Sequence, residues 1–173
     1  MSRYVRVKLA LMDHIDRILT QWRQERPDLQ VAPMGTIGRI KQLNQQLMRG
    51  MEQTWSAHGL NGASFDVLAT LRRSGSPYAL SPGDLMASTM VTSGTMTHRI
   101  DQLVKAELVE RVRNPDDGRG FLISLTPQGH ELIDEAVTAH VETQTKLVAA
   151  LTEEQRAQLD DLLKRFLRGF ERS

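Results

Sequence analysis

Residues 81–126 read SPGDLMASTMVTSGTMTHRIDQLVKAELVERVRNPDDGRGFLISLT, and this stretch decides the fold. It contains two helix signals followed by two short strand signals around a polar tip: a helix opened by Ser81-Pro82-Gly83-Asp84, a helix over Thr92 to Ala106, strands over Val109 to Arg113 and Phe121 to Leu125, and a tip over Asn114 to Gly120. This order is typical of a winged helix-turn-helix, which places its second helix in a DNA groove. The predicted fold class is therefore mainly α, of the α+β type.

Amphipathic helices flank this module on both sides. Apolar side chains recur every three or four residues, the spacing of one helix face, in three segments: Leu9, Met12, Ile15, Leu19 and Trp22; Ile37, Ile40, Leu43, Leu47, Met51 and Trp55; Leu159, Leu162, Leu163, Phe166 and Phe170. These faces exceed what so small a module covers, so we expect a second copy of the chain to cover them about a two-fold axis. The alternative is that the flanks fold back as an intramolecular bundle.

The predicted organisation is a single domain over 1–173, with dimerisation helices at 12–57 and 127–172 and a DNA-binding region at 62–125. Within it, Gly62 to Arg73 is apolar nearly all round, as expected of a buried helix. Thr126-Pro127 marks the start of a long helix, with threonine as the cap and proline just inside it. Thr152 to Gln155 is a capping box that starts the last helix.

Composition excludes several other classes of protein. The chain of 173 residues has 22 Lys+Arg against 21 Asp+Glu, a net charge of +1, so a DNA-binding face must concentrate its basic residues. The absence of cysteine excludes disulfides and thiolate metal sites. No apolar run is long enough to span a membrane, and no secretion signal is evident, so we expect a cytoplasmic protein.

The signals for an enzyme are weak. An active site needs converging acid, base or nucleophilic groups, and Ser64 near Asp66 lacks an evident base. His130 and Asp134 have helical i,i+4 spacing, but histidines on a long helix are more often surface or interface residues than metal ligands. We therefore expect no catalysis, no metal and no cofactor.

The second helix carries the candidate DNA-reading residues. With Met96 at the centre of the inner face, Ile100 and Leu103 share that face at 3.6 residues per turn. The residues that point outward or sideways and are predicted to contact DNA are Ser93, Gly94, Thr95, Thr97, His98 and Gln102. In the wing, Arg119 is placed to enter the minor groove, with Asp117 holding its guanidinium.

Four further residues suggest a site inside the protein. Arg99 lies on the inward flank of the second helix, Arg111 is in the first strand, and Asp66 is embedded in an apolar helix. One interpretation is a single salt bridge between Asp66 and an arginine, with Trp22 in the core. The other is a pocket for a planar anion, in which two arginines neutralise the charge, Asp66 accepts an N–H and Trp22 contacts the ring.

The sequence resembles the MarR family of bacterial transcription regulators over nearly its whole length. The residues that carry the resemblance are Thr92 to Leu103, Ala106 to Arg111, Pro115 to Gly120 and Leu125 to Gly129. Glu107 stands where glycine is common in the family, and Gly118 where a second wing arginine is common. The resemblance implies a homodimer that binds a pseudo-palindromic operator on double-stranded DNA, usually as a repressor, and releases it when a small ligand binds.

Within that family, the urate-responsive branch has an added N-terminal helix and a four-residue ligand signature. Trp22, Asp66, Arg99 and Arg111 fit the places of that signature, which implies urate or a related purine signal as the effector. Arginines and tryptophan suit a phenolic or other aromatic acid equally well. A third alternative is a winged helix that contacts only other proteins.

Overall fold

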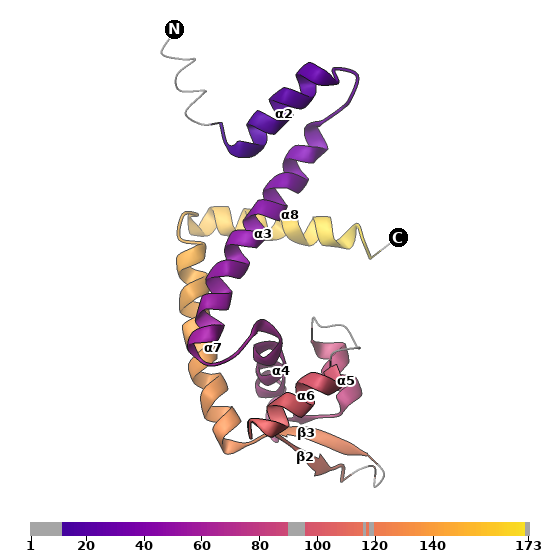
Figure 1. Ribbon diagram of the computed structural model, residues 1–173, viewed down its shortest axis with the longest axis vertical. Coiled ribbons are helices and arrows are strands. Elements are labelled where there is room, and N and C mark those ends of the chain that lie inside the picture. Colours follow the sequence, from indigo (N-terminus) through magenta and orange to yellow (C-terminus); the bar gives the residue numbers. More distant parts are fainter. Residues whose placement is uncertain (1–11, 90–95, 116, 118–119, 172–173) are drawn as a thin grey trace. The chain divides into compact units, whose positions relative to one another are not determined.

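The computed structural model describes residues 12–89, 96–115, 117 and 120–171, which are mostly helical with a small antiparallel sheet (Figure 1). Its contacts divide the chain into two compact units, Met1–Arg49 and Gly50–Ser173, with the boundary inside the long helix α3 (Ala32–Ala57). Each unit is described by itself. Among the described residues, no helix has both the length and the apolar character needed to cross a lipid bilayer.

In the first unit, α2 (His14–Glu25) packs against the N-terminal half of α3. The side chain of Leu19 lies over Gly35 and that of Ile15 over Gly38, at distances that leave no room for a larger residue at either glycine without a shift. The predicted apolar stripe therefore makes the contact between these helices. Arg26 ends α2, as the sequence indicates.

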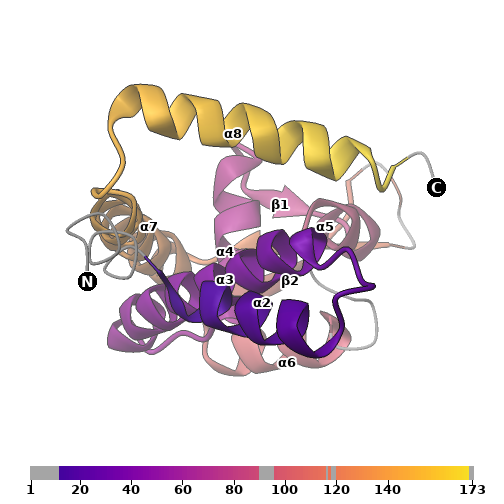
Figure 2. The ribbon, with the colours of Figure 1, turned by 90° about the horizontal axis from the view of Figure 1, so that it is seen from above.

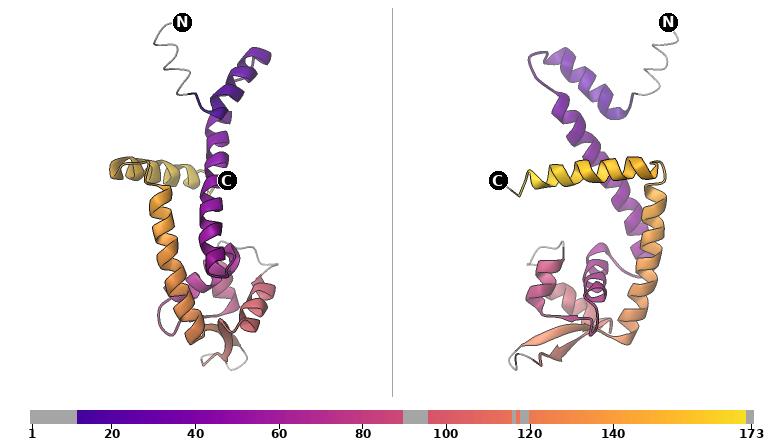
Figure 3. Two further views of the ribbon diagram at one scale, coloured as in Figure 1. Left: turned by 60° about the vertical axis from the view of Figure 1, so that its left-hand side comes forward. Right: turned by 180° about the vertical axis from the view of Figure 1, so that it is seen from behind.

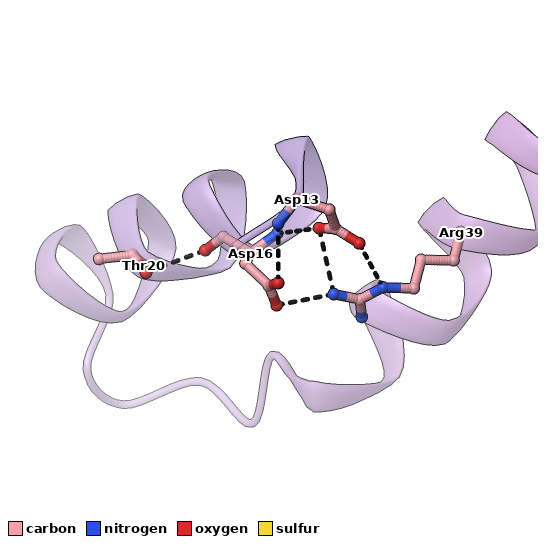
Figure 4. A network of polar contacts seen from close by, with 4 residues as sticks. All are labelled: Asp13, Asp16, Thr20 and Arg39. Atoms are coloured by element: carbon pink, nitrogen blue, oxygen red, sulfur yellow. Dashed lines mark hydrogen bonds and ion pairs between the residues drawn. The ribbon is translucent and has the colours of Figure 1, made fainter. Parts of the chain in front are cut away.

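An arginine fork fastens the start of α2 to α3 (Figure 4). Arg39 donates from Nε to Asp13 Oδ2 over 2.7 Å and from Nη2 to Asp16 Oδ1 over 2.6 Å. The same two aspartates form a capping box at the start of α2, so one cation stabilises the carboxylates that cap the helix. The hydrogen bond from Arg39 lowers the pKa of Asp13 below its ordinary value.

The second unit is built around α4 (Gly62–Arg73). This helix packs against α5 (Pro82–Ser88), α6 (Met96–Lys105), α7 (Pro127–Leu147) and the sheet, and in Figure 2 it lies between α7 and α5. Its buried side chains include Val67, Leu68 and Leu71, which are fully enclosed, as its apolar sequence predicts. α4 is thus the core on which the other elements are positioned.

The sheet has three strands in the order β1-β3-β2, all antiparallel. β2 (Val109–Arg113) and β3 (Phe121–Leu125) have the predicted bounds, and Val109 pairs with Leu125 in their register. The strand β1 (Ala79–Leu80) was not predicted, because two residues are too few to show a periodic pattern. α6 is described from Met96, so the predicted start of this helix at Thr92 lies outside the described residues.

A tight junction joins the end of α6 to the start of α7. The Thr126 hydroxyl caps α7 by accepting a hydrogen bond from Gly129 N–H over 2.9 Å, and it donates to the Glu107 carbonyl over 2.7 Å. Thr126 N–H donates to the Leu108 carbonyl. Gly129 is required here, because a Cβ at this position would lie 1.9 Å from that same carbonyl oxygen.

Glu107, after the end of α6, has a φ of +59°, in the left-handed region that favours glycine. We expect Glu107→Gly to raise the free energy of unfolding by about 0.5–1 kcal/mol. Glycine removes the cost of the left-handed conformation, and this gain exceeds the loss from the greater backbone entropy of the unfolded chain. Urea unfolding of this variant and of Glu107→Ala, which keeps the Cβ, measures the effect. Equal stability of the two variants would contradict this explanation.

An aromatic cluster fills the space between α4, α7 and the C-terminal end of α3. Trp55 stacks on Phe65 and on His140, with ring centroids 5.4 and 5.7 Å apart. Within the described part of the chain, the Nδ1 of His140 is buried without a hydrogen-bond partner. Burial lowers the pKa of His140 below its ordinary value of 6.5, because the charged ring is desolvated in this environment.

This histidine makes stability depend on pH. Above the ordinary pKa of 6.5, the ring is neutral in the folded and the unfolded chain, and the protein has its full stability. As the pH falls below 6.5, the unfolded chain binds a proton at this histidine before the folded chain does. The free energy of unfolding therefore falls with the pH until the lowered pKa of the folded state is passed. We expect His140→Phe, which keeps a ring in the cluster, to flatten the loss of stability in acid. Urea unfolding at pH values on both sides of 6.5 tests this. If the free energy of unfolding of His140→Phe depends on pH as that of the wild type does, other groups cause the loss of stability in acid.

The second unit ends in two long helices. α7 leads from the sheet to a sharp bend, after which α8 (Glu153–Arg168) runs in a new direction (Figure 3). The predicted capping box starts α8, with Gln155 N–H donating to Thr152 Oγ1 over 3.2 Å and Thr152 N–H to Gln155 Oε1 over 2.9 Å. α8, all of which is described, has no buried residue in the single chain, and its apolar side chains remain exposed.

Candidate DNA-binding surface and effector site

The helix α6 has one face in the core and one in solvent. Met96, Ile100 and Leu103 are buried, which confirms the predicted inner face. Thr97, His98 and Gln102 lie on the other side, where their side chains can contact an external partner. Ser93, Gly94 and Thr95, also predicted to contact DNA, lie outside the described residues.

The preceding helix is firmly placed against the core. Ser81 caps α5 through its hydroxyl, which accepts a hydrogen bond from Asp84 N–H over 3.1 Å, and Pro82 occupies the first turn as predicted. Leu85 is fully buried in the core beside α4, and Arg73 of α4 donates a hydrogen bond to the Ser88 carbonyl at the end of α5. α5 is thus held at both ends, as the first helix of a helix-turn-helix requires.

The wing is the hairpin of β2 and β3, which projects at the lower end of the unit in Figure 1. At its tip, Asn114 N–H donates to the Gly120 carbonyl over 3.1 Å and Gly120 N–H donates to the Asp117 carbonyl over 3.0 Å. Asp117 is exposed there, while Arg119 lies outside the described residues, and the roles predicted for both at the DNA stay predictions. A closed, polar hairpin beside an exposed helix is the geometry with which winged helices contact the backbone and the minor groove.

Behind the exposed face of α6 lies a cation with an unsatisfied nitrogen. Arg99 is half-buried, and its Nη1 atom is enclosed without a hydrogen-bond partner among the described residues. Asp66 is half-buried on α4, which packs against α6. A buried guanidinium nitrogen that lacks an acceptor is costly, so this position favours an anion that supplies one.

Arg111 is engaged in a way that spacing alone did not indicate. Its guanidinium forms an ion pair with Asp101 of α6 and lies 5.6 Å from the ring centroid of Phe121 on β3. Sequence reasoning missed Asp101, because a pair ten residues apart on a helix and a strand has no local signature. α4, α6 and β2 therefore supply Asp66, Arg99 and Arg111 from elements of one unit, in which α6 packs on both α4 and β2.

Trp22 belongs to the first unit. It is exposed on α2 and lines a shallow surface hollow together with Gln21, Gln24 and Glu25. The predicted ring contact of Trp22 with an effector stays a prediction.

The pair His130 and Asp134 has a structural explanation. Arg72 donates from Nε to Asp134 Oδ1 over 2.6 Å, and this bond lowers the pKa of Asp134. His130 Nδ1 lies 3.6 Å from the other carboxylate oxygen. Over the described ranges no group of three or more histidine, cysteine or acidic side chains is placed to hold a metal ion.

Comparison with known proteins agrees with this geometry. The model of the MarR family matches residues 58–120. The HTH-type transcriptional regulator PecS of Dickeya dadantii is 37% identical over 165 residues, which cover 95% of each chain.

Solved structures show the same fold bound to DNA and under ligand control. A mutant of MarR from E. coli, complexed with operator DNA, is 28% identical with a TM-score of 0.68, covering 84% of this chain and 97% of that one. BpsR of Bordetella bronchiseptica, whose DNA binding is regulated by 6-hydroxynicotinic acid, is 25% identical with a TM-score of 0.67, covering 80% and 95%. These relatives are regulators and not enzymes.

Proposed function

Because the chain belongs to the MarR family of transcriptional regulators, we propose that it is a homodimeric repressor that leaves a pseudo-palindromic operator when a small anionic aromatic molecule such as urate binds. In general terms, this is a ligand-responsive, DNA-binding transcriptional regulator. The observation that carries the proposed effector is the enclosed Nη1 of Arg99, which has no partner among the described residues and belongs to the helix that presents Thr97 and His98.

The proposed DNA contacts follow from the two faces of α6. Its outward polar residues Thr97, His98 and Gln102 enter the major groove together with Ser93, Gly94 and Thr95. Arg119 of the wing enters the adjacent minor groove, and Asp117 holds its guanidinium in place. A two-fold dimer repeats these elements, so the preferred operator has two half-sites related by the same symmetry.

The proposed effector site is formed by Asp66, Arg99 and Arg111 of the second unit, and the ring contact predicted for Trp22 of the first unit stays a prediction. Two arginines favour an anion, and Asp66 accepts a hydrogen bond from a ring N–H, a pattern that urate satisfies. The presence of the helix α2 ahead of α3, with Trp22 on it, supports this assignment. The regulation of BpsR by 6-hydroxynicotinic acid favours a second candidate, another aromatic acid at the same residues.

The proposed release mechanism is a linkage between two sites on one helix. Arg99 is on the inner side of α6 and Thr97, His98 and Gln102 are on the outer side, so an anion that draws Arg99 into a new position also moves the DNA-reading face. Ligand and operator then oppose each other through one coupling free energy, typically about 1–3 kcal/mol or a roughly 5- to 150-fold change in affinity.

Fluorescence anisotropy of labelled duplex from the DNA upstream of its own gene, at fixed salt with and without urate, tests the proposal. We expect urate to weaken binding, and Asp66→Asn and Arg99→Ala to abolish that response. Lys105→Ala, which removes an exposed cation from the same helix, should respond as the wild type does. A normal urate response in both site variants would show that the site assignment is wrong.

The remaining outcomes separate the alternatives. Duplex binding that is insensitive to urate but released by 6-hydroxynicotinic acid would support the second candidate effector. Failure to bind any duplex in a salt-dependent way would contradict the repressor and support a winged helix that contacts proteins only.

A further inference from the structure

We infer that Asp101 is an internal competitor for the guanidinium of Arg111, so that the anionic effector gains this arginine only by displacing the Asp101 carboxylate. The inference rests on the proposed effector site. It adds a residue that sets ligand affinity without itself contacting the ligand.

The ion pair between Asp101 and Arg111 joins two elements that ligand binding is expected to move. Asp101 is on α6 and Arg111 is on β2, and their ion pair ties the DNA-reading helix to the wing. Phe121, diagonally across the β2–β3 ladder, lies beside the guanidinium with its ring centroid 5.6 Å from Cζ. Arg111 is therefore held by a carboxylate and by an aromatic ring before any ligand arrives.

The exposure of the pair makes the carboxylate displaceable. The side chain of Asp101 is 55% exposed and that of Arg111 38% exposed, so water screens the attraction and solvates the carboxylate once it is released. Arg99 differs, because its enclosed Nη1 has no acceptor among the described residues. An incoming anion thus meets one cation with an unsatisfied nitrogen and one held by a weak intramolecular ion pair.

The exchange gives ligand binding a second route to the DNA-reading helix. When the effector takes Arg111, the contact between α6 and β2 through Asp101 is lost, while Arg99 gains a partner. Both events act on α6. In the unliganded state Asp101 pairs with Arg111, and in the liganded state the effector does. Linkage then requires that removal of Asp101 strengthens ligand binding.

Isothermal titration of urate into the full-length protein without DNA tests this. We expect Asp101→Asn to lower the Kd of urate about two- to fivefold, the range set by an exposed ion pair. Glu110→Gln removes an equal charge from an exposed carboxylate next to Arg111 in the sequence and should leave the Kd unchanged. In an Arg111→Ala background, Asp101→Asn should have no effect, since the competition is then gone.

A second measurement follows Arg111 directly and needs no ligand. Phenylglyoxal modification of Arg111, followed by peptide mass spectrometry, should be faster in Asp101→Asn than in the wild type and in Glu110→Gln. Urate binding to the wild type with an unchanged Kd in Asp101→Asn, or an equal gain in the Arg111→Ala background, would overturn the inference and leave the proposed effector standing. A wild-type protein that binds no urate would overturn the urate proposal, and this inference with it.

Discussion

Replacement of both Leu162 and Phe166 by glutamate is expected to reduce operator affinity by roughly 10²- to 10⁴-fold, because a dimer that binds two half-sites gains that much from avidity. Both residues are on α8, where they are 62% and 42% exposed in the single chain. They are four positions apart and so lie on one helix face. Two buried carboxylates at a subunit interface would prevent its formation.

The apolar face is wider than these two residues. Leu159, Leu163, Leu167 and Phe170 lie on the same side of α8 and its C-terminal end and are also exposed in the single chain. Contiguous apolar surface of this kind is rare on monomeric proteins and marks an interaction site. The family resemblance implies a homodimer, so a second copy of the chain is the partner that we propose for this face.

Analytical ultracentrifugation and anisotropy with operator duplex measure the two consequences of the double substitution. Ala157→Glu is the control for an added carboxylate on α8, because Ala157 is exposed on the opposite side of this helix; it adds one negative charge where the double variant adds two. We expect the double variant to sediment as a monomer and the control as a dimer. A dimeric double variant with normal operator affinity would show that another surface joins the subunits.

Gly129→Ala is expected to lower the free energy of unfolding by about 3 kcal/mol or more, at the upper end of what overpacking costs. The added Cβ would lie 1.9 Å from the Leu108 carbonyl oxygen and 2.8 Å from its carbon, and both are backbone atoms that no rotamer change can move. Relief of the clash must separate α7 from the turn after α6. That separation also breaks the hydrogen bonds of Thr126 to Glu107 and Leu108.

Urea unfolding monitored by circular dichroism measures this loss. Gly83→Ala is the matched control, since the nearest neighbour of its added Cβ would be Ser81 Oγ at 3.7 Å, an ordinary van der Waals distance. Alanine is favoured over glycine in a helix, so this control is expected to be neutral or slightly stabilising. Equal stability of the two variants would show that the junction accommodates a methyl group.

The elements with local signals were predicted closely. Thr126 and Thr152 start α7 and α8 as predicted, because a cap is a hydrogen bond between residues three positions apart. β2 and β3 have the predicted ends, and Met96, Ile100 and Leu103 form the buried face of α6. The strand β1 was not predicted, because its two residues are extended through pairing with β3 and not through a local pattern.

The candidate effector site stays a prediction. The type and charge of Asp66, Arg99 and Arg111 indicated an anion site, and the structure places them on elements of one compact unit. Which acid pairs with which arginine was not predictable: Arg111 pairs with Asp101, while Arg99 Nη1 finds no partner among the described residues. Ion pairing depends on distances between elements, which sequence spacing does not contain.

The sequence by itself determined the order of the elements apart from β1, the starts of α5, α7 and α8, the buried face of α6 and the family. Each of these depends on residues a few positions apart or on a motif read directly. Only the tertiary structure decided that Gly129 packs against the Leu108 carbonyl, that Glu107 takes a left-handed backbone conformation, and that Asp101 forms an ion pair with Arg111. Those features arise where distant segments come into contact. Close packing leaves such contacts little tolerance, and no local pattern encodes distances of that kind.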